Sequence, residues 1–264
     1  SIIMVPTIDI KKLGERFLGY ADSYQTGDAD DYGYVAKRDH TMRVYENARQ
    51  IALAAGVDEE TLMVIEATAI LHDVGRFEEW RRYKSYKRKK EFDHAKEGAN
   101  FLRQGLIKKM IPETRMYDDL IILAVDVHGD MLLPDNLDER ERTICDIIRD
   151  ADRIDIFYLC TRDSDFDRMY NQEVGEKFLT QCVKENFKAG KPINIFDLRN
   201  KLDVLALELG LMKQLTTKAS KLVIIKNNLA NRMVDVFKAK LPYYDEKEVE
   251  WLREEINEYL KRIS

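Results

Sequence analysis

Apolar residues recur every three or four positions through most of this chain, a spacing that places them on one face of an α-helix. Alternating runs of β-branched residues, which would indicate strands, are scarce. Only five prolines and twelve glycines interrupt the 264 residues, so long helices can continue without a break. No repeat or low-complexity linker divides the chain. The sequence therefore predicts an all-α protein with a single domain over residues 1–264.

Capping residues bound several of the helices. Asp58 precedes two glutamates, an arrangement that caps a helix and complements its dipole. Gly56 stands where the preceding helix would end in a left-handed residue. A Gly/Asp-rich segment over residues 24–39 is expected to be irregular. Helices are predicted near residues 40–55, 58–75, 94–105, 117–129, 138–160, 165–188, 197–212, 218–239 and 245–262.

The apolar stripes of four predicted helices run into histidine or aspartate, so polar groups point inward. A buried carboxylate without a partner costs several kcal/mol or takes up a proton. A divalent metal compensates for such a group, because it binds neutral imidazoles and anionic carboxylates. Each residue alone also fits a core histidine or a capping aspartate, whereas the combination favours a metal site. In the first stripe, His40 precedes Val44 and Ala48. In the other three, Ile65 and Ala69 lead to His72 and Asp73, Ile121 and Val125 lead to His128, and Ile144 and Ile148 lead to Asp152 and Asp155.

Composition narrows the class of protein. The net charge of −5 argues against a general nucleic-acid binder, since such domains tend to be basic. No apolar run reaches the roughly 18 residues of a membrane-spanning helix, and residues 1–17 lack the features of a secretory signal. Three widely spaced cysteines fit a reducing compartment better than a disulfide framework. A cytoplasmic protein is expected.

A basic segment, "RRYKSYKRKK" at residues 81–90, lies between Asp73 and His94 and contains seven Lys or Arg. Three explanations remain open: a solvated surface, a nucleic-acid strip with interleaved aromatic residues, or a cationic rim that attracts phosphates. The segment starts and ends beside candidate metal ligands, which favours the rim.

The ordered set His40, His72-Asp73, His94, His128 and Asp152 resembles the HD superfamily of metal-dependent phosphohydrolases, whose minimal signature is H…HD…D. The stretches "HTMRV", "AILHDVGR" and "DADRID" match that signature, and "DHAKEGANFL" and "AVDVHGD" resemble two additional histidine motifs of the binuclear branch. The resemblance covers residues 38–160. It implies an HD-type helical bundle. Residues 161–264 lie outside the resemblance, and we expect them to form a C-terminal helical extension packed on the core of the same domain.

The resemblance also implies how the metals are held. One metal would be bound by His40, His72, Asp73 and Asp152, and a second by Asp73 as a bridging carboxylate together with His94 and His128. Asp152 is chosen over Asp150 because it continues the apolar stripe, and Asp150 and Asp155 would orient the histidines. One or two divalent transition-metal ions are expected (Mn, Fe, Co, Ni or Zn, with Mg a further option), so a mononuclear site stays open.

The activity implied is that of a phosphohydrolase of the phosphomonoesterase or phosphodiesterase type. It would use a metal-activated water on a small phosphate ester or anhydride, with a nucleotide as the favoured substrate. Asp73 and Arg76 would be catalytic. Arg76 is the first choice for a direct phosphate contact, followed by Arg81, Arg82 and Arg153.

Two other functions remain as alternatives. The same ligands occur in a mixed-valence di-iron oxygenase branch of the superfamily, which acts on small polar or phosphonate substrates. A non-catalytic ligand-sensing module is the third option. The expected partner is a small anionic, phosphate-containing substrate, with neither nucleic acid nor a membrane. The amphipathic C-terminal helix leaves a homodimer open.

Overall fold

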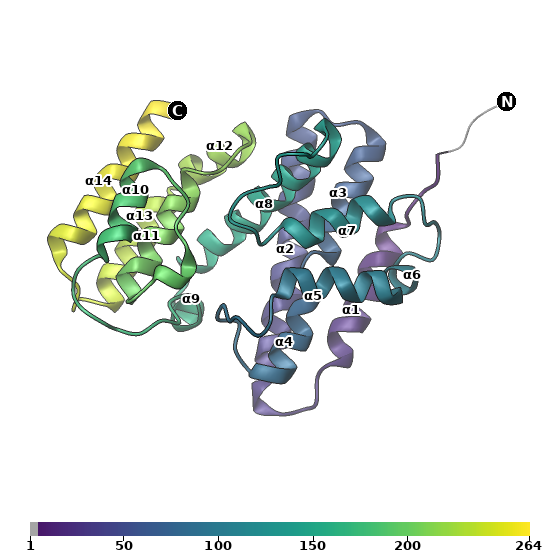
Figure 1. The fold of residues 1–264 in the computed structure, drawn as a ribbon, viewed down its shortest axis with the longest axis horizontal. Coiled ribbons are helices and arrows are strands. Elements are labelled where there is room, and N and C mark those ends of the chain that lie inside the picture. Colours follow the sequence, from purple (N-terminus) through teal and green to yellow (C-terminus); the bar gives the residue numbers. More distant parts are fainter. Residues whose placement is uncertain (1–4) are drawn as a thin grey trace. The chain divides into compact units, whose positions relative to one another are not determined.

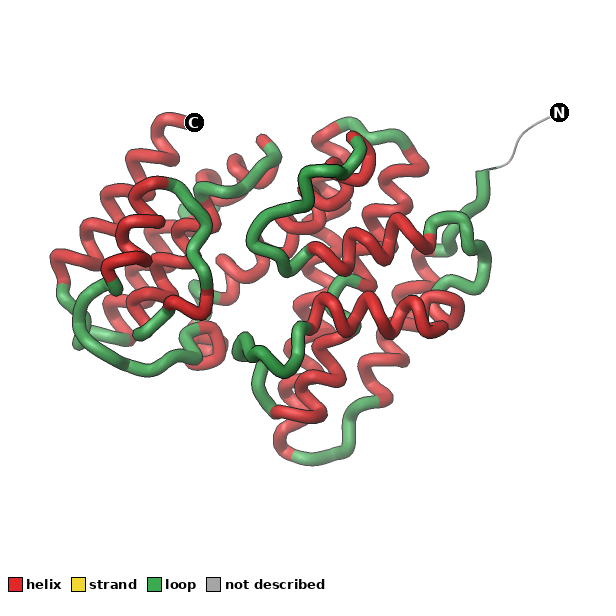
Figure 2. Tube along the Cα trace, viewed as in Figure 1, coloured by secondary structure: helices red, strands yellow, loops and turns green. Residues whose placement is uncertain are grey.

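The computed structural model describes residues 5–264, and all regular elements in this range are helices or short helical turns (Figures 1 and 2). The all-α prediction is therefore confirmed. Residues 1–4, which belong to the N-terminal stretch considered for a secretory signal, lie outside the described range. The chain divides into two compact units at Asp152, and each is described by itself. The expectation of a single domain stays a prediction.

The first unit extends to Asp152 and is built around one apolar helix, α3, which packs against α1, α2 and α7. Asp58 caps α3, because its carboxylate accepts a hydrogen bond from the backbone N–H of Thr61 at 2.7 Å. The helices of this unit are α1 (Ile10–Ser23), α2 (Tyr32–Ala55), α3 (Glu59–Leu71), α4 (Gly75–Tyr83), α5 (His94–Phe101), α6 (Ile107–Met110), α7 (Asp118–Val127) and α8 (Glu139–Leu159), the last of which continues into the second unit.

Two helix boundaries in the first unit differ from the prediction. Helix α2 begins at Tyr32, although the segment 24–39 was expected to be irregular. Helix α3 ends at Leu71, and Gly75 begins α4 instead of ending the preceding helix. Each region contains a glycine whose lack of a side chain allows another part of the chain to pack closely against its backbone. A Cβ on Gly33 would lie 2.0 Å from the Trp80 ring, and a Cβ on Gly75 would lie 2.2 Å from the His94 carbonyl oxygen.

The second unit, residues 153–264, has an apolar core of its own that includes Phe187, Leu205, Phe237 and Leu252. Its helices are α9 (Phe166–Met169), α10 (Gln181–Ala189), α11 (Lys201–Met212), α12 (Lys218–Lys226), α13 (Leu229–Lys240) and α14 (Glu246–Ile263).

Two predicted helices of this unit are each divided into two. The 165–188 helix is interrupted before Thr180, where the buried Asp203 accepts hydrogen bonds from Thr180 and Arg199 and so holds an irregular segment in place. The 218–239 helix breaks at Asn228, whose φ of 51° is left-handed. Among the helices of residues 5–264, none combines the length and the apolar character needed to span a bilayer.

Candidate metal centre

Five helices of the first unit deliver six histidines and aspartates to one place. His40 lies within α2, His72 and Asp73 directly follow α3, and His94 begins α5. The carboxylate of Asp93 caps α5 and fixes the position of His94 at its first turn. The remaining two residues are His128, at the C-terminal end of α7, and Asp152, on α8.

Asp73 lies at the middle of this arrangement, and its side chain is only 3% exposed. Its Oδ2 lies 3.3 Å from His40 Nε2 and 3.4 Å from His72 Nε2. Its Oδ1 lies 3.5 Å from His94 Nε2 and 3.3 Å from His128 Nε2. The two oxygens of one carboxylate therefore face two different pairs of imidazoles, which is the geometry of a bridging ligand.

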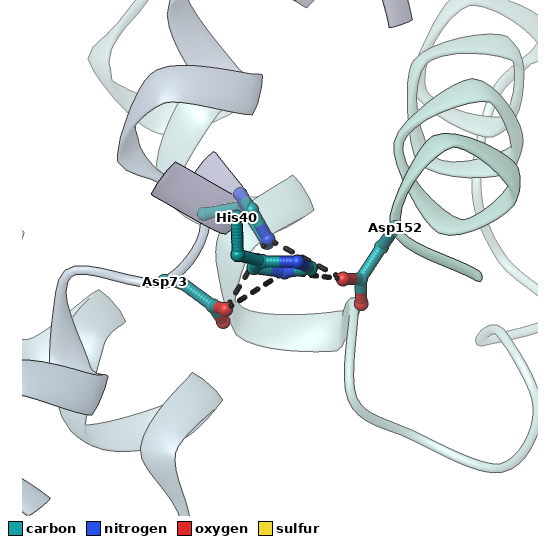
Figure 3. Close-up of side chains that lie close together, drawn as sticks. His40, Asp73 and Asp152 are labelled. Carbon is teal, nitrogen blue, oxygen red and sulfur yellow. Dashed lines mark ion pairs between the residues drawn. The ribbon is translucent and has the colours of Figure 1, made fainter. Parts of the chain in front are cut away.

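Asp152 completes the first group. Its Oδ1 lies 3.0 Å from His40 Nε2 and 3.6 Å from His72 Nε2. Figure 3 shows the His40 ring between the carboxylates of Asp73 and Asp152. One ligand atom from each of these four residues falls within 4.8 Å of all the others. A metal ion placed among them would be reached by two imidazoles and two carboxylates, a donor set suited to divalent transition metals.

The second group shares Asp73 and is smaller. The Nε2 atoms of His94 and His128 lie 3.3 Å apart, and one ligand atom each from Asp73, His94 and His128 falls within 4.8 Å of the others. Each of these three side chains is more than nine-tenths buried. Three protein ligands leave open positions that water or substrate oxygens can fill.

Backbone carbonyls orient two of the imidazole rings. His72 Nδ1 lies 2.6 Å from the Ala69 carbonyl oxygen, and His128 Nδ1 lies 2.6 Å from the Val125 carbonyl oxygen. A proton on Nδ1 satisfies each carbonyl and leaves the Nε2 lone pair facing the carboxylates. His72 Nε2 is buried and faces the carboxylates of Asp73 and Asp152, at 3.4 and 3.6 Å. A lone pair and a carboxylate repel each other unless a proton or a metal ion lies between them, so this position binds either an additional proton or a divalent metal ion.

The electrostatics of the centre agree with this fit. Burial opposes a charge on His72, yet the carboxylates of Asp73 and Asp152 raise its pKa to about 10. Against the same effect of burial, His72 and the nearby Lys37 hold the pKa of Asp73 well below its usual range. Burial and the charge of Arg76 lower the pKa of His94 well below its usual value. The first group therefore attracts a cation strongly, and the second group already presents a neutral imidazole.

Arg76 is a predicted substrate-binding residue whose charge interacts with Asp73 and His94 of this centre. Its Nη1 donates to Glu79 Oε1 at 2.6 Å and to the Tyr86 carbonyl oxygen at 3.3 Å. Its Nε is buried and has no hydrogen-bond partner among residues 5–264. Glu79 is 1% exposed and also binds Lys89, with Nζ and Oε2 2.5 Å apart. Arg76 is therefore held firmly while one of its donors stays unused.

The other predicted substrate contacts have different surroundings. Arg81 and Arg82 both pair with Glu78, and their side chains are 56% and 47% exposed. Arg153 belongs to the second unit and donates to the Gln214 carbonyl oxygen at 3.3 Å. Their roles in substrate binding stay predictions, as do the orienting roles of Asp150 and Asp155, which are both buried.

Two cations beside the centre were not singled out from the sequence. Lys37 Nζ lies 3.8 Å from Asp73 Oδ2, and Arg88 Nη2 donates to the Gly129 carbonyl oxygen at 3.3 Å. A signal for Lys37 existed, since it precedes His40 by three positions and so shares its helical face. Arg88 carried no such signal, because nothing in the basic segment distinguishes it from its neighbours.

Comparison with known families agrees with the geometry. Residues 38–156 match the model of the HD domain family. Comparison with curated proteins and with solved structures gave no match. The matched segment begins just before His40, extends past Asp152 and includes both groups of candidate ligands. This chain therefore contains an HD domain over residues 38–156.

Proposed function

We propose that this chain is a metal-dependent phosphohydrolase that cleaves a phosphate ester or anhydride of a small molecule, with nucleotides as the favoured class. The observation that carries the proposal is the position of Asp73, whose two carboxylate oxygens face separate pairs of histidines. The HD domain at residues 38–156 supports the same general chemistry, because proteins with this domain are generally metal-dependent hydrolases.

His40, His72, Asp73 and Asp152 would hold one divalent metal ion, and Asp73, His94 and His128 a second. When bound, such ions lower the pKa of a water molecule and stabilise negative charge on a displaced phosphoryl group. The chain's own task is then to bring the phosphate to the two groups and hold it there.

Arg76 would hold the phosphate. Its guanidinium is fixed by Glu79 and by the Tyr86 carbonyl oxygen, so little side-chain entropy is lost when an anion binds. The buried Nε, which has no hydrogen-bond partner, can donate to a phosphate oxygen. Asp73 contributes differently, by keeping the two histidine pairs at a fixed separation and so fixing where the phosphate must lie.

A panel of nucleotides and simple phosphoesters, assayed with Mn²⁺, Mg²⁺, Zn²⁺, Co²⁺ and Fe²⁺, tests this function. We expect metal-supported phosphate release without O₂, lost by more than about a hundredfold in His72→Ala and in Asp73→Ala because both variants break the metal groups. Arg103→Gln is the matched control, since this side chain is exposed and donates a hydrogen bond to the nearby Asn100.

Both variants must keep the helical circular dichroism spectrum of the wild type, so that the loss of phosphate release can be attributed to the metal groups and not to unfolding. Turnover that survives unchanged in either variant would contradict the hydrolase. Iron-dependent O₂ uptake coupled to substrate oxidation, with no phosphate released, would also contradict it and would support the di-iron oxygenase instead.

A further inference from the structure

Three cations contributed by different parts of the first unit lie beside the metal centre. Lys37 on α2 approaches the side of Asp73 that faces His40, with 3.8 Å between Nζ and Oδ2. Arg76 on α4 is close enough to Asp73 for their charges to interact. The third cation is Arg88, in the loop between α4 and α5.

Arg88 lies on the other side of the centre, next to the second group of ligands. Its Nη2 would be 3.9 Å from a Cβ on Gly129, and His94 Cε1 would be 3.7 Å from the same atom. Gly129 directly follows His128. Because Gly129 has no side chain, Arg88 and His94 line one small region together with Ala95, whose Cβ would be 3.3 Å from a Cβ at this position.

Tyr86 keeps the loop that carries Arg88 in place. Its hydroxyl donates to the Gly33 carbonyl oxygen at 2.6 Å, at the start of α2. The Lys37 ammonium and the Arg76 guanidinium both contact its ring, 5.0 and 5.5 Å from the centroid. The loop is thus attached to α2 through Tyr86 and to the end of α7 through Arg88. Arg88 is held beside the centre rather than left on a mobile surface chain.

The charges of the three cations are balanced to different degrees. Arg76 Nη1 lies 2.6 Å from Glu79 Oε1, and Lys37 pairs with Asp73. Arg88 donates to an uncharged carbonyl, and its 4.0 Å separation from Asp93 Oδ2 is at the outer limit of an ion pair. Its side chain is only 30% exposed, and burial together with the charge of Arg76 lowers the pKa of its guanidinium. Asp93, Glu79 and Asp130 offset this effect only in part. A largely buried guanidinium that its neighbours compensate incompletely is stabilised by an anion that reaches it.

We infer that Arg88 is a specificity-determining residue that binds a second anionic group of the substrate, so that this site favours molecules with two adjacent phosphoryl groups over simple monoesters. The inference rests on the proposed function, since it concerns the same site. The phosphoryl group that reacts would lie at the metal groups against Arg76, and its neighbour would lie against Arg88. Planar guanidinium donors match the oxygens of such a group and can bind two of them at once.

The test compares pyrophosphate with orthophosphate as ligands of the full-length chain, by calorimetry with Mn²⁺ in excess. We expect wild-type protein and Arg103→Gln to bind pyrophosphate at least tenfold more tightly than orthophosphate. Arg88→Gln should lose about tenfold in pyrophosphate affinity and less than about twofold in orthophosphate affinity, because one charge-assisted contact is removed. Arg88→Lys should recover part of the loss, since it restores the charge without the planar donor pair.

Equal losses for the two ligands in Arg88→Gln would overturn the inference, and so would unchanged affinity for both. The result is separable from the hydrolase test. Arg88-dependent selection of pyrophosphate in a chain that hydrolyses nothing would contradict only the proposed function. If Arg88→Gln still releases phosphate and still prefers diphosphates, only the role of Arg88 would be contradicted.

Discussion

His72 and His94 are both buried imidazoles, yet their surroundings act on them in opposite directions. Asp73 and Asp152 raise the pKa of His72 to about 10, whereas burial and Arg76 lower the pKa of His94. At neutral pH and without a metal ion, His72 therefore carries a second ring proton, on Nε2, whereas His94 does not. A metal ion must displace that proton to bind the first group, and it meets no such competitor at His94.

The two groups should consequently respond differently to pH. Affinity for Mn²⁺ at the first group should rise by about tenfold per pH unit through the neutral range and level off near pH 10, where His72 has lost its proton. Affinity for Mn²⁺ at the second group should change little at pH values above the usual pKa of histidine, since His94 is already neutral there. Calorimetry in buffers of different ionisation enthalpy measures the released protons directly.

Variants isolate the groups for this measurement. His128→Ala leaves the first group whole and should release about one proton per metal at pH 7.5. Asp152→Ala, which leaves Asp73, His94 and His128 intact, should release almost none. Equal proton release from both variants would show that the difference between the two histidines does not govern metal binding.

At the scale of helices, the contact between α4 and α5 sets the spacing of the two ligand groups. Gly75 begins α4, two residues after Asp73, and its backbone approaches the first turn of α5 without any intervening side chain. A Cβ there would lie 2.2 Å from the His94 carbonyl oxygen and 2.9 Å from the Gly98 backbone nitrogen. Backbone atoms cannot rotate aside as a side chain does, so one helix would have to shift.

Gly75→Ala should therefore destabilise the chain by about 3 kcal/mol, near the upper end of the usual effect of overpacking. It should also weaken metal binding at the group that contains His94. Gly19→Ala on α1 is the matched control, because a Cβ there meets nothing within 4 Å. That control should stabilise the helix by about 0.5–1 kcal/mol. Urea denaturation compares the two, and a Gly75→Ala variant as stable as wild type would disprove the contact.

The resemblance to the HD superfamily supplied the full set of candidate ligands, His94 included. Helical periodicity indicated only that residues such as His40 and Asp152 continue apolar stripes that the core must bury. It could not predict the beginning of α2 or of α4. Local preference treats glycine as a helix end, whereas Gly33 and Gly75 lie inside or at the start of helices for the sake of contacts with Trp80 and His94. Those contacts join residues far apart in the sequence, and no local pattern carries them. The position of Arg88 depends on the same kind of long-range contact, to Gly129.

At the scale of the whole chain, every candidate ligand belongs to the first of the two compact units. A ligand stabilises the folded unit that binds it, by about 2.7 kcal/mol at a hundred times its dissociation constant. Saturating Mn²⁺ should therefore slow hydrogen exchange in α2, α3 and α7 of the full-length chain and leave α10 to α14 unchanged. Equal slowing in the second unit would show that the two units open together, as a single domain would.

The sequence contains two tryptophans, and the structure gives one to each unit. The Trp80 and Tyr86 rings pack at a tilt, with 4.9 Å between their centroids, and the ring centroids of Trp251 and Phe187 are 5.6 Å apart. Intrinsic fluorescence can thus follow the units separately. In Trp251→Phe all indole emission comes from beside the loop that carries Arg88, and in Trp80→Phe it comes from the helices beyond Asp152.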